Sequence, residues 1–321
     1  MSTRPAPRET QNSPWRTQGE FFRRKVGAAA RKVPLDAGLS CPNRDGTVSR
    51  SGCLFCNASG SGTGLAARGL DLAAQWAFQA PRVRAKHPQA RLLAYLQAYS
   101  NTHCEPQRLR GLLEAVAALP GVAGLCLGTR PDCLDADTTL ERLDILGEFA
   151  ARLGFLQLDL GLQSADPAVL SRIGRGHGPE IFARAVRGAA ERGLSVCAHL
   201  MHGLPGPDGV CGPDDLTRSA EFVSGLPVES VKFHNTLVCR GTGLERLWRE
   251  GAYAPPGREE YVADLARALA RLRPDICVQR LAADPAPGEL VAPDWGADKR
   301  GTIELLRAEL ARLGFRQGCL A

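Results

Sequence analysis

Residues 32–56 read KVPLDAGLSCPNRDGTVSRSGCLFC, a short apolar stretch and then a glycine-bearing loop that contains Cys41, Cys53 and Cys56. In α/β folds, loops at the carboxyl ends of parallel strands build the functional site. The C-x2-C pair places two thiolates within reach of one metal or cluster, and the glycines let the loop fold Cys41 back to them. Three ligands are informative, because structural zinc and electron-transfer sites are normally closed by a fourth, whereas a reactive site keeps one position open.

The rest of the chain alternates short apolar runs with longer segments of helical spacing. This alternation is typical of βαβ units and a parallel sheet. Periodicity leaves both an open doubly wound sheet and a partial barrel as alternatives. The expected strands lie near residues 32–35, 92–98, 124–127, 155–160, 196–201 and 231–237, and the expected helices near 68–86, 106–119, 138–153, 179–192 and 214–225.

The pattern breaks at the APPG sequence of residues 254–257, where prolines and glycine interrupt it. Beyond this point the spacing predicts helices near 258–272 and 298–313, on either side of a strand at 276–281. We therefore expect three parts: a basic N-terminal arm at 1–28, a core domain at 29–250 and a small C-terminal extension at 251–321.

Composition places the chain among ordinary globular proteins, since 44% of its 321 residues are hydrophobic and 23% are charged. No apolar stretch approaches the roughly 20 residues of a membrane span, and the first residues lack the apolar core of a secretory signal. We therefore expect a cytoplasmic protein that does not enter the membrane. Eleven cysteines in a reducing compartment predict metal binding or burial rather than a disulfide framework.

The cysteine loop resembles that of the radical S-adenosylmethionine (SAM) superfamily, whose usual signature is CxxxCxxC with an aromatic residue before the last cysteine. Phe55 occupies that place. The longer gap between Cys41 and Cys53 departs from the usual spacing but is similar to one branch, the YhcC and YtqA type, which is related to the catalytic subunit of Elongator. The similarity to that branch also covers QAYSNT at 97–102, GTRPDC at 128–133, LGLQ at 160–163 and GLPG at 203–206.

This resemblance implies a partial (β/α)6 barrel with a small α/β C-terminal extension. It also implies a 4Fe-4S cluster held by Cys41, Cys53 and Cys56, whose fourth iron binds the amine and carboxylate of SAM. An electron donor such as flavodoxin or ferredoxin reduces the cluster, and cleavage of SAM then yields a 5′-deoxyadenosyl radical that abstracts a hydrogen atom from the substrate.

The resemblance also suggests contacts to SAM. Phe55 is expected near the adenine and Gln163 at the ribose, while Arg175 is expected to pair with the methionine carboxylate, which suits a planar guanidinium. Gly203 would let the backbone approach the adenine. Simpler explanations are a strand-end hydrogen bond for Gln163, a solvated helix end for Arg175 and an ordinary turn for Gly203.

Two further cysteines and three histidines each have two explanations. Cys133 and Cys197 fall at positions similar to those of the family and either take part in the chemistry or pack in the core, where cysteine is often found. His177, His199 and His234 are either structural histidines or groups that face the barrel mouth as proton donors or acceptors.

The substrate is the least defined feature. Residues 1–34 carry eight Lys and Arg against two Glu, and Trp15, Phe21 and Phe22 lie among them, a combination that suits RNA. The alternative is a disordered soluble tail. The Elongator-like resemblance implies modification of the wobble uridine of tRNA. Competing hypotheses are a radical SAM enzyme acting on a small metabolite, and a non-catalytic iron–sulfur or zinc-binding protein.

Overall fold

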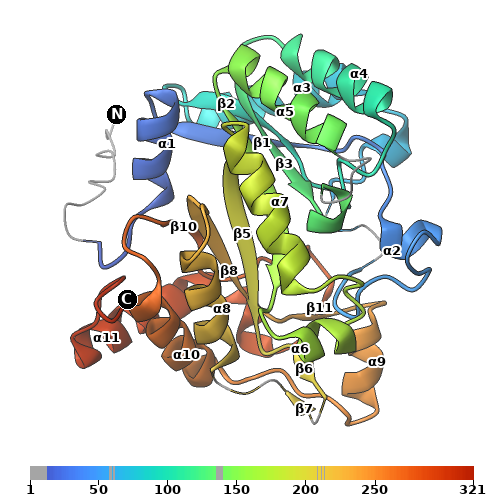
Figure 1. The fold of residues 1–321 in the computed structure, drawn as a ribbon. Coiled ribbons are helices and arrows are strands. Elements are labelled where there is room, and N and C mark those ends of the chain that lie inside the picture. The colour runs from blue at the N-terminus through green and yellow to red at the C-terminus, as the bar shows by residue number, and fades with distance from the viewer. Residues whose placement is uncertain are drawn as a thin grey trace.

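A sheet of seven parallel strands curls into a half-barrel at the centre of the molecule, with helices on its outer face (Figure 1). The structure is a computed structural model that describes residues 13–57, 60, 62–134, 140–207, 209–210, 212 and 214–321. In spatial order the strands are β1 (Ala30–Leu35), β2 (Arg91–Leu96), β3 (Val122–Thr129), β4 (Leu156–Gln163), β5 (Ser195–His202), β8 (Ser230–Asn235) and β10 (Cys277–Arg280).

The six strands expected from the sequence are all present, and the partial barrel is confirmed. The sheet also has a seventh strand. The segment at 276–281, which was expected to be a strand of the C-terminal extension, forms β10 and pairs in parallel with β8 through Cys277 and Ser230. A strand at the edge of a sheet leaves a row of backbone groups unpaired, and β10 satisfies those of β8.

The outer face of the sheet is covered by helices at the positions that the periodicity predicted. In α7, Phe182, Ala185, Val186 and Ala189 recur at helical spacing, and all are buried. Residues 138 and 139 of one predicted helix lie outside the described residues. The covering helices are α3 (Leu72–Lys86), α4 (Pro106–Ala117), α5 (Leu140–Leu153), α7 (Pro179–Glu191), α8 (Asp215–Ser224), α10 (Arg258–Arg271) and α11 (Lys299–Leu313).

Shorter elements, several of them near the carboxyl ends of the strands, were not predicted. They are the helices α2 (Pro42–Asp45), α6 (Pro167–Arg172) and α9 (Gly243–Arg249), the 3₁₀ turns η1 (Ala66–Arg68), η2 (Pro131–Cys133) and η4 (Asp294–Ala297), and two small ribbons, β6 (Pro205–Gly206) with β7 (Gly209–Val210) and β9 (Val238–Cys239) with β11 (Leu290–Ala292). In the described part of the chain, every helix falls short of the length and apolar character needed to cross a bilayer.

The concave side of the sheet is polar. Strand β4 reads LQLDLGLQ, and its four leucines pack in the main hydrophobic core with the outer helices. Because side chains alternate along a strand, Gln157, Asp159 and Gln163 lie on the opposite face, where Asp159 and Gln163 line a cavity. The alternation therefore gives a half-barrel with a polar lumen on its concave side.

The sequence did not predict the N-terminal helix α1 (Gln18–Val26). This helix closes the end of the half-barrel at which the strands begin. It begins with a capping box, in which the Thr17 hydroxyl and the Glu20 carboxylate each accept a backbone N–H of the other residue. Phe21 and Phe22 pack edge-on against Phe155, with ring centroids 6.3 and 6.0 Å away.

The expectation that Trp15, Phe21 and Phe22 stack on RNA bases is wrong, because these side chains are only 8%, 1% and 2% exposed. The two phenylalanines belong to a cluster that includes Ala30 and Cys277, the first residues of β1 and β10. This cluster lies at the amino ends of the strands, away from the loops that carry the cysteines. Residues 1–12, with the remaining arginines of the expected arm, lie outside the described residues.

We predict that Phe21→Ala lowers the free energy of unfolding by about 3–5 kcal/mol, because it removes a fully buried ring from the base of the half-barrel. Arg23→Ala, an exposed position on the same helix, is the matched control and changes stability by less than about 1 kcal/mol. Urea unfolding followed by circular dichroism measures both. Equal and small effects would contradict the packing of α1 described above.

Candidate functional site

The three cysteines of the predicted loop meet at one cavity. The chain leaves β1, reaches Cys41 at the start of α2, and turns back at Gly46 and Gly52, both of which have positive φ values that favour glycine. The Gly52 N–H donates to the carbonyl of Asn43 at 2.7 Å and closes the loop. As a result, Cys41, Cys53 and Cys56 all line a cavity of about 490 Å³ at the carboxyl side of the sheet.

The loop is held across the mouth of the half-barrel by backbone hydrogen bonds of Leu54. Its N–H donates to the carbonyl of Ile173, just after α6, at 3.0 Å, and its carbonyl accepts from the N–H of Leu244 in α9 at 2.9 Å. The Asn57 side chain also donates to the carboxylate of Glu289 at 2.6 Å. The cysteines are therefore fixed by contacts with segments that follow β4, β8 and β10.

Polar groups face the cysteine sulfurs. The Sγ atom of Cys53 accepts from Nδ2 of Asn43 at 3.2 Å and from Nη1 of Arg175 at 3.7 Å. Burial raises the pKa of the Cys56 thiol, and the guanidinium of Arg44 opposes that shift. This guanidinium also donates to the carbonyl of Cys56 at 3.0 Å, so the loop contains its own cation.

The spacing of the sulfurs disfavours a single metal ion. Among the described residues, the one group of three Cys, His, Asp or Glu ligand atoms within 4.8 Å of one another is Asp159, Cys197 and His199, so the three loop sulfurs are set further apart. A tetrahedral zinc with bonds of about 2.3 Å would draw its sulfurs closer than that limit. An iron–sulfur cube binds each cysteine at a different iron and therefore requires a wider spacing of the sulfurs than a single zinc ion.

Gln163 and Arg175 lie together at this cavity. Arg175 is 6% exposed and donates to the carbonyl of Gly161 at 2.7 Å, so the solvated helix end considered from the sequence is wrong. A Cβ atom on Gly161 would lie 2.5 Å from Nε2 of Gln163 and 2.7 Å from Nη2 of Arg175. Gln163 has a φ of 79°, which is rare for residues other than glycine and is often found at functional sites.

Phe55 and Gly203 differ in their relation to the cavity. Phe55 is half-buried and lines the cavity, where it packs against a cluster that includes Leu170 and Met201. Gly203 is not among the described residues that line the cavity. Its φ of 77° and the ring of Pro256, 2.5 Å from the position of an added Cβ, explain why glycine is needed there.

Sequence reasoning missed three polar residues that organise the mouth, Asn43, Arg44 and Arg130. Arg130 is 3% exposed, pairs with Asp132 at 2.7 Å and donates to the carbonyl of Arg175 at 2.7 Å. Asn43 likewise donates to the carbonyl of Gly174 at 2.7 Å. The CPNRD and TRPD segments were visible in the sequence, but Gly174 and Arg175, to which Asn43 and Arg130 donate, lie far away along the chain.

The remaining cysteines and histidines divide into two groups. Cys133 and Cys197 are buried, and burial raises the pKa of each thiol to about 12, so packing accounts for them as expected. His199 and His234 line the cavity with ring centroids 5.4 Å apart. His177 is not among the described lining residues, and its Nδ1 lies 3.2 Å from the carbonyl of Gly178.

The comparisons with known proteins agree with this fold and site, a curled half-barrel of parallel strands with a loop of three cysteines at its mouth. The family model of the radical SAM superfamily matches residues 50–209, and that of the Radical_SAM C-terminal domain matches residues 228–312. The archaeal Elp3 of Methanocaldococcus infernus has the same fold, with a TM-score of 0.63 at 19% identity over 79% of this chain and 62% of that chain. The chain belongs to the radical SAM superfamily.

Within the superfamily, the chain is similar along nearly its whole length to two bacterial proteins. It is 32% identical over 318 residues to YtqA of Bacillus subtilis, covering 99% of this chain and 96% of that protein. It is 36% identical over 291 residues to YhcC of Escherichia coli, covering 90% of each. A more distant relative, the tRNA uridine(34) acetyltransferase of Methanocaldococcus jannaschii, is 27% identical over 196 residues, which are 61% of this chain and 34% of that protein.

The family defines the cofactors. Radical SAM enzymes use a 4Fe-4S cluster and SAM, and this chain is such an enzyme. The non-catalytic alternatives considered from the sequence are therefore excluded.

We predict that replacing Cys41, Cys53 or Cys56 with alanine removes most of the bound iron and abolishes SAM cleavage, because each change deletes a cysteine sulfur that lines the cavity. Cys133→Ala, a buried thiol outside the lining of the cavity, is the matched control and retains both properties. Iron and sulfide analysis of anaerobically purified protein, together with 5′-deoxyadenosine formation, provides the readout. Full iron content and cleavage in any loop variant would contradict the assignment.

Proposed function

We propose that Cys41, Cys53 and Cys56 hold the 4Fe-4S cluster and that the enzyme modifies the wobble uridine of tRNA. The observation that carries the proposal is the convergence of these cysteines with Gln163 and Arg175 at one cavity on the carboxyl side of the half-barrel. Such a cluster, once reduced by an electron donor, would supply the electron that cleaves a carbon–sulfur bond of SAM to give methionine and the 5′-deoxyadenosyl radical.

The residues around the cluster bind and shield it. Asn43 and Arg175 donate to Cys53, which stabilises a thiolate ligand, and Arg44 adds positive charge beside Cys56. The tethered loop covers the mouth of the lumen and limits access of water to the reacting groups.

Residues beside the cluster are proposed to bind SAM. Arg175 pairs with the methionine carboxylate: its Nε atom is buried without a hydrogen-bond partner among the described residues, and a carboxylate supplies an acceptor. Gln163 contacts the ribose and Phe55 packs near the adenine, since both line the cavity. Gly203 remains a proposed adenine contact through its backbone.

Support for a tRNA substrate comes from the relatives, because one of them is named for uridine 34 of tRNA. The expected basic arm gives little support, since Phe21 and Phe22 pack at the end of the sheet away from the cysteines and Trp15 is buried in the main hydrophobic core. We therefore propose that RNA approaches the mouth, where the cysteine loop lies. A small metabolite is the competing substrate class, and a cavity of about 490 Å³ is large enough for one.

The proposed setting is the cytoplasm, with a flavodoxin or ferredoxin as electron donor. All ten cysteines among the described residues are free thiols, in keeping with a reducing compartment.

Arg175→Ala is expected to weaken SAM binding by about 1.5–3 kcal/mol while iron content stays normal, because the change removes a charged donor. Arg172→Ala, an exposed position at the end of α6, serves as the control with unchanged affinity. Anaerobic titration with SAM measures the difference. If both variants bind SAM like the wild type, Arg175 has no role in SAM binding.

The substrate is tested by incubating the anaerobic holoenzyme with tRNA from a strain that lacks the corresponding gene, together with SAM and a reductant. Mass spectrometry of the nucleosides is expected to show a mass change at the wobble uridine, dependent on Cys56. The tRNA substrate is rejected if SAM is cleaved but no nucleoside changes in tRNA that carries every precursor of the wobble-uridine modification. That outcome would favour the small metabolite.

A further inference from the structure

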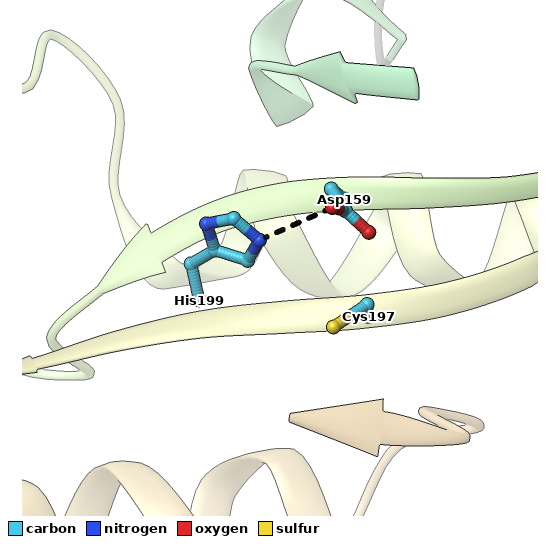
Figure 2. A group of neighbouring side chains, drawn as sticks. All are labelled: Asp159, Cys197 and His199. Carbon is cyan, nitrogen blue, oxygen red and sulfur yellow. Dashed lines mark ion pairs between the residues drawn. The ribbon is translucent and has the colours of Figure 1, made fainter. Parts of the chain in front are cut away.

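The lumen below the cysteines contains a second group of residue types that bind metals. Asp159, Cys197 and His199 project from the neighbouring strands β4 and β5, with the imidazole of His199 turned toward the carboxylate, 3.7 Å away (Figure 2). The Nζ atoms of Lys232 and Lys32 lie 2.5 and 3.4 Å from Oδ2 of Asp159, so this carboxylate already has cationic partners. A divalent cation would face two ammonium groups, and the group is therefore not a metal site.

The cations at the mouth are arranged differently, because they face sulfur. Arg44, Arg130 and Arg175 line the same cavity as the three cysteines. Among the described residues, Asp132 is the one carboxylate that forms an ion pair with any of these arginines. In the proposed function, the charge of Arg175 is used by the carboxylate of SAM. Arg44 and Arg130 have no such assignment.

The guanidinium of Arg44 is held at the Cys56 side of the cysteine loop. It donates to the carbonyls of Cys56, at 3.0 Å, and Asn57, and its Cζ atom lies 5.6 Å from the ring centroid of Tyr99. Burial lowers the pKa of this guanidinium, but its hydrogen bond with Cys56 and the charge of that residue raise it above the ordinary value. Because the loop itself supplies the acceptors, this cation is fixed beside the cysteine.

Arg130 lies on the side of Cys41 and Cys53. Its Nε and Nη2 atoms donate to Asp132 at 2.9 and 2.7 Å, and Nη2 also donates to the carbonyl of Arg175 at 2.7 Å. Burial lowers the pKa of the guanidinium, whereas Asp132 and then Cys41 and Cys53 raise it, so both sulfurs are close enough to act on it. Its Nη1 atom is buried without an acceptor in the described part of the chain. Buried donors normally have acceptors, and the sulfurs of a bound cluster are acceptors.

We propose that Arg44 and Arg130 raise the reduction potential of the cluster. This inference rests on the part of the proposed function that assigns the cluster to the three cysteines. A 4Fe-4S cluster with three thiolate ligands is negatively charged, and the electron that it takes from the flavodoxin or ferredoxin makes it more negative. That donor is oxidised by one electron, and no bond forms or breaks.

Fixed cations beside the cluster stabilise its reduced form more than its oxidised form, because the attraction grows with the negative charge. The effect is strong for Arg130, whose side chain is 3% exposed and poorly screened by water. Both arginines are held by hydrogen bonds to nearby backbone or to Asp132, so their charges stay in place when the electron arrives. An electron donor of moderate potential can then reduce the cluster.

Asp132 gives this inference a sign that packing alone does not reproduce. Burial raises the pKa of Asp132, but the hydrogen bonds from Arg130 lower it below the ordinary value, so the carboxylate is ionised at neutral pH. Removal of the arginine charge lowers the potential, whereas removal of the aspartate charge raises it. Both changes break the same ion pair, so a purely structural role would not give opposite effects.

The test measures the potential of the cluster in the anaerobic holoenzyme, by redox titration followed by electron paramagnetic resonance, without SAM or RNA. The variants are Arg44→Gln, Arg44→Lys, Arg130→Gln, Asp132→Asn and the double variant Arg130→Gln with Asp132→Asn. Arg50→Gln is the matched control, because it removes an exposed charge of the same loop from outside the lining of the cavity. Iron and sulfide analysis and circular dichroism show that each variant is loaded and folded.

Arg44→Gln and Arg130→Gln are each expected to lower the equilibrium constant for reduction roughly 10-fold, which is about 59 mV for one electron. Arg44→Lys keeps the charge and is expected to lower it less. Asp132→Asn is expected to raise the potential, and the double variant to return it toward the wild-type value. Arg50→Gln is expected to leave it unchanged.

An unchanged potential in Arg44→Gln or Arg130→Gln, or shifts of the same sign in Arg130→Gln and Asp132→Asn, would overturn the proposal. If Arg130→Gln fails to hold a cluster, a potential that is not raised in Asp132→Asn overturns it instead. The titration requires neither SAM nor RNA, so its failure is separate from a failure to modify tRNA. The cysteine assignment is tested by iron content and not by potential.

Discussion

Two backbone hydrogen bonds of Leu54 determine where the cysteines lie. The loop leaves the first strand of the sheet, yet Leu54 donates to Ile173 and accepts from Leu244, which follow the fourth and sixth strands of the sheet in spatial order. A loop of this length that was attached only at its own ends would sample many conformations. These bonds join it to distant parts of the half-barrel, so the spacing of the sulfurs depends on the assembled sheet and not on the motif alone.

The polar lumen is a consequence of the open architecture of the half-barrel. A closed eight-stranded barrel fills its interior with branched apolar side chains, whereas here the inward positions of β4 carry Gln157, Asp159 and Gln163. Burying Asp159 with two lysines costs several kcal/mol of desolvation per ion, which their attraction offsets only in part. Such groups contribute little to stability, and the low dielectric of the interior strengthens every polar contact that they make.

The sequence predicts the strands and the covering helices well, because their signals are local: apolar runs, helical spacing and glycines at turns. It predicts the cysteines because the C-x2-C pair is also local. Membership of β10 in the sheet and the buried position of α1 depend on partners far along the chain, so Phe21 and Phe22 among basic residues looked like an exposed arm. The roles of Asn43 and Arg130 could not be predicted from the sequence for the same reason. They donate to Gly174 and Arg175, which are distant along the chain and approach them only in the folded protein.

The tie between α1 and β10 has a consequence for the order of assembly. The carbonyl of Arg16 accepts the N–H of Val278 at 2.8 Å, and Phe21 and Phe22 share a cluster with Cys277. On the ribosome, residues are made from the amino terminus, so α1 emerges long before the strand that completes its surroundings. Phe155 emerges about halfway through synthesis, but the cluster around the two phenylalanines is completed only when β10 supplies Cys277, so the nascent chain offers an incompletely covered apolar segment to chaperones until late in translation.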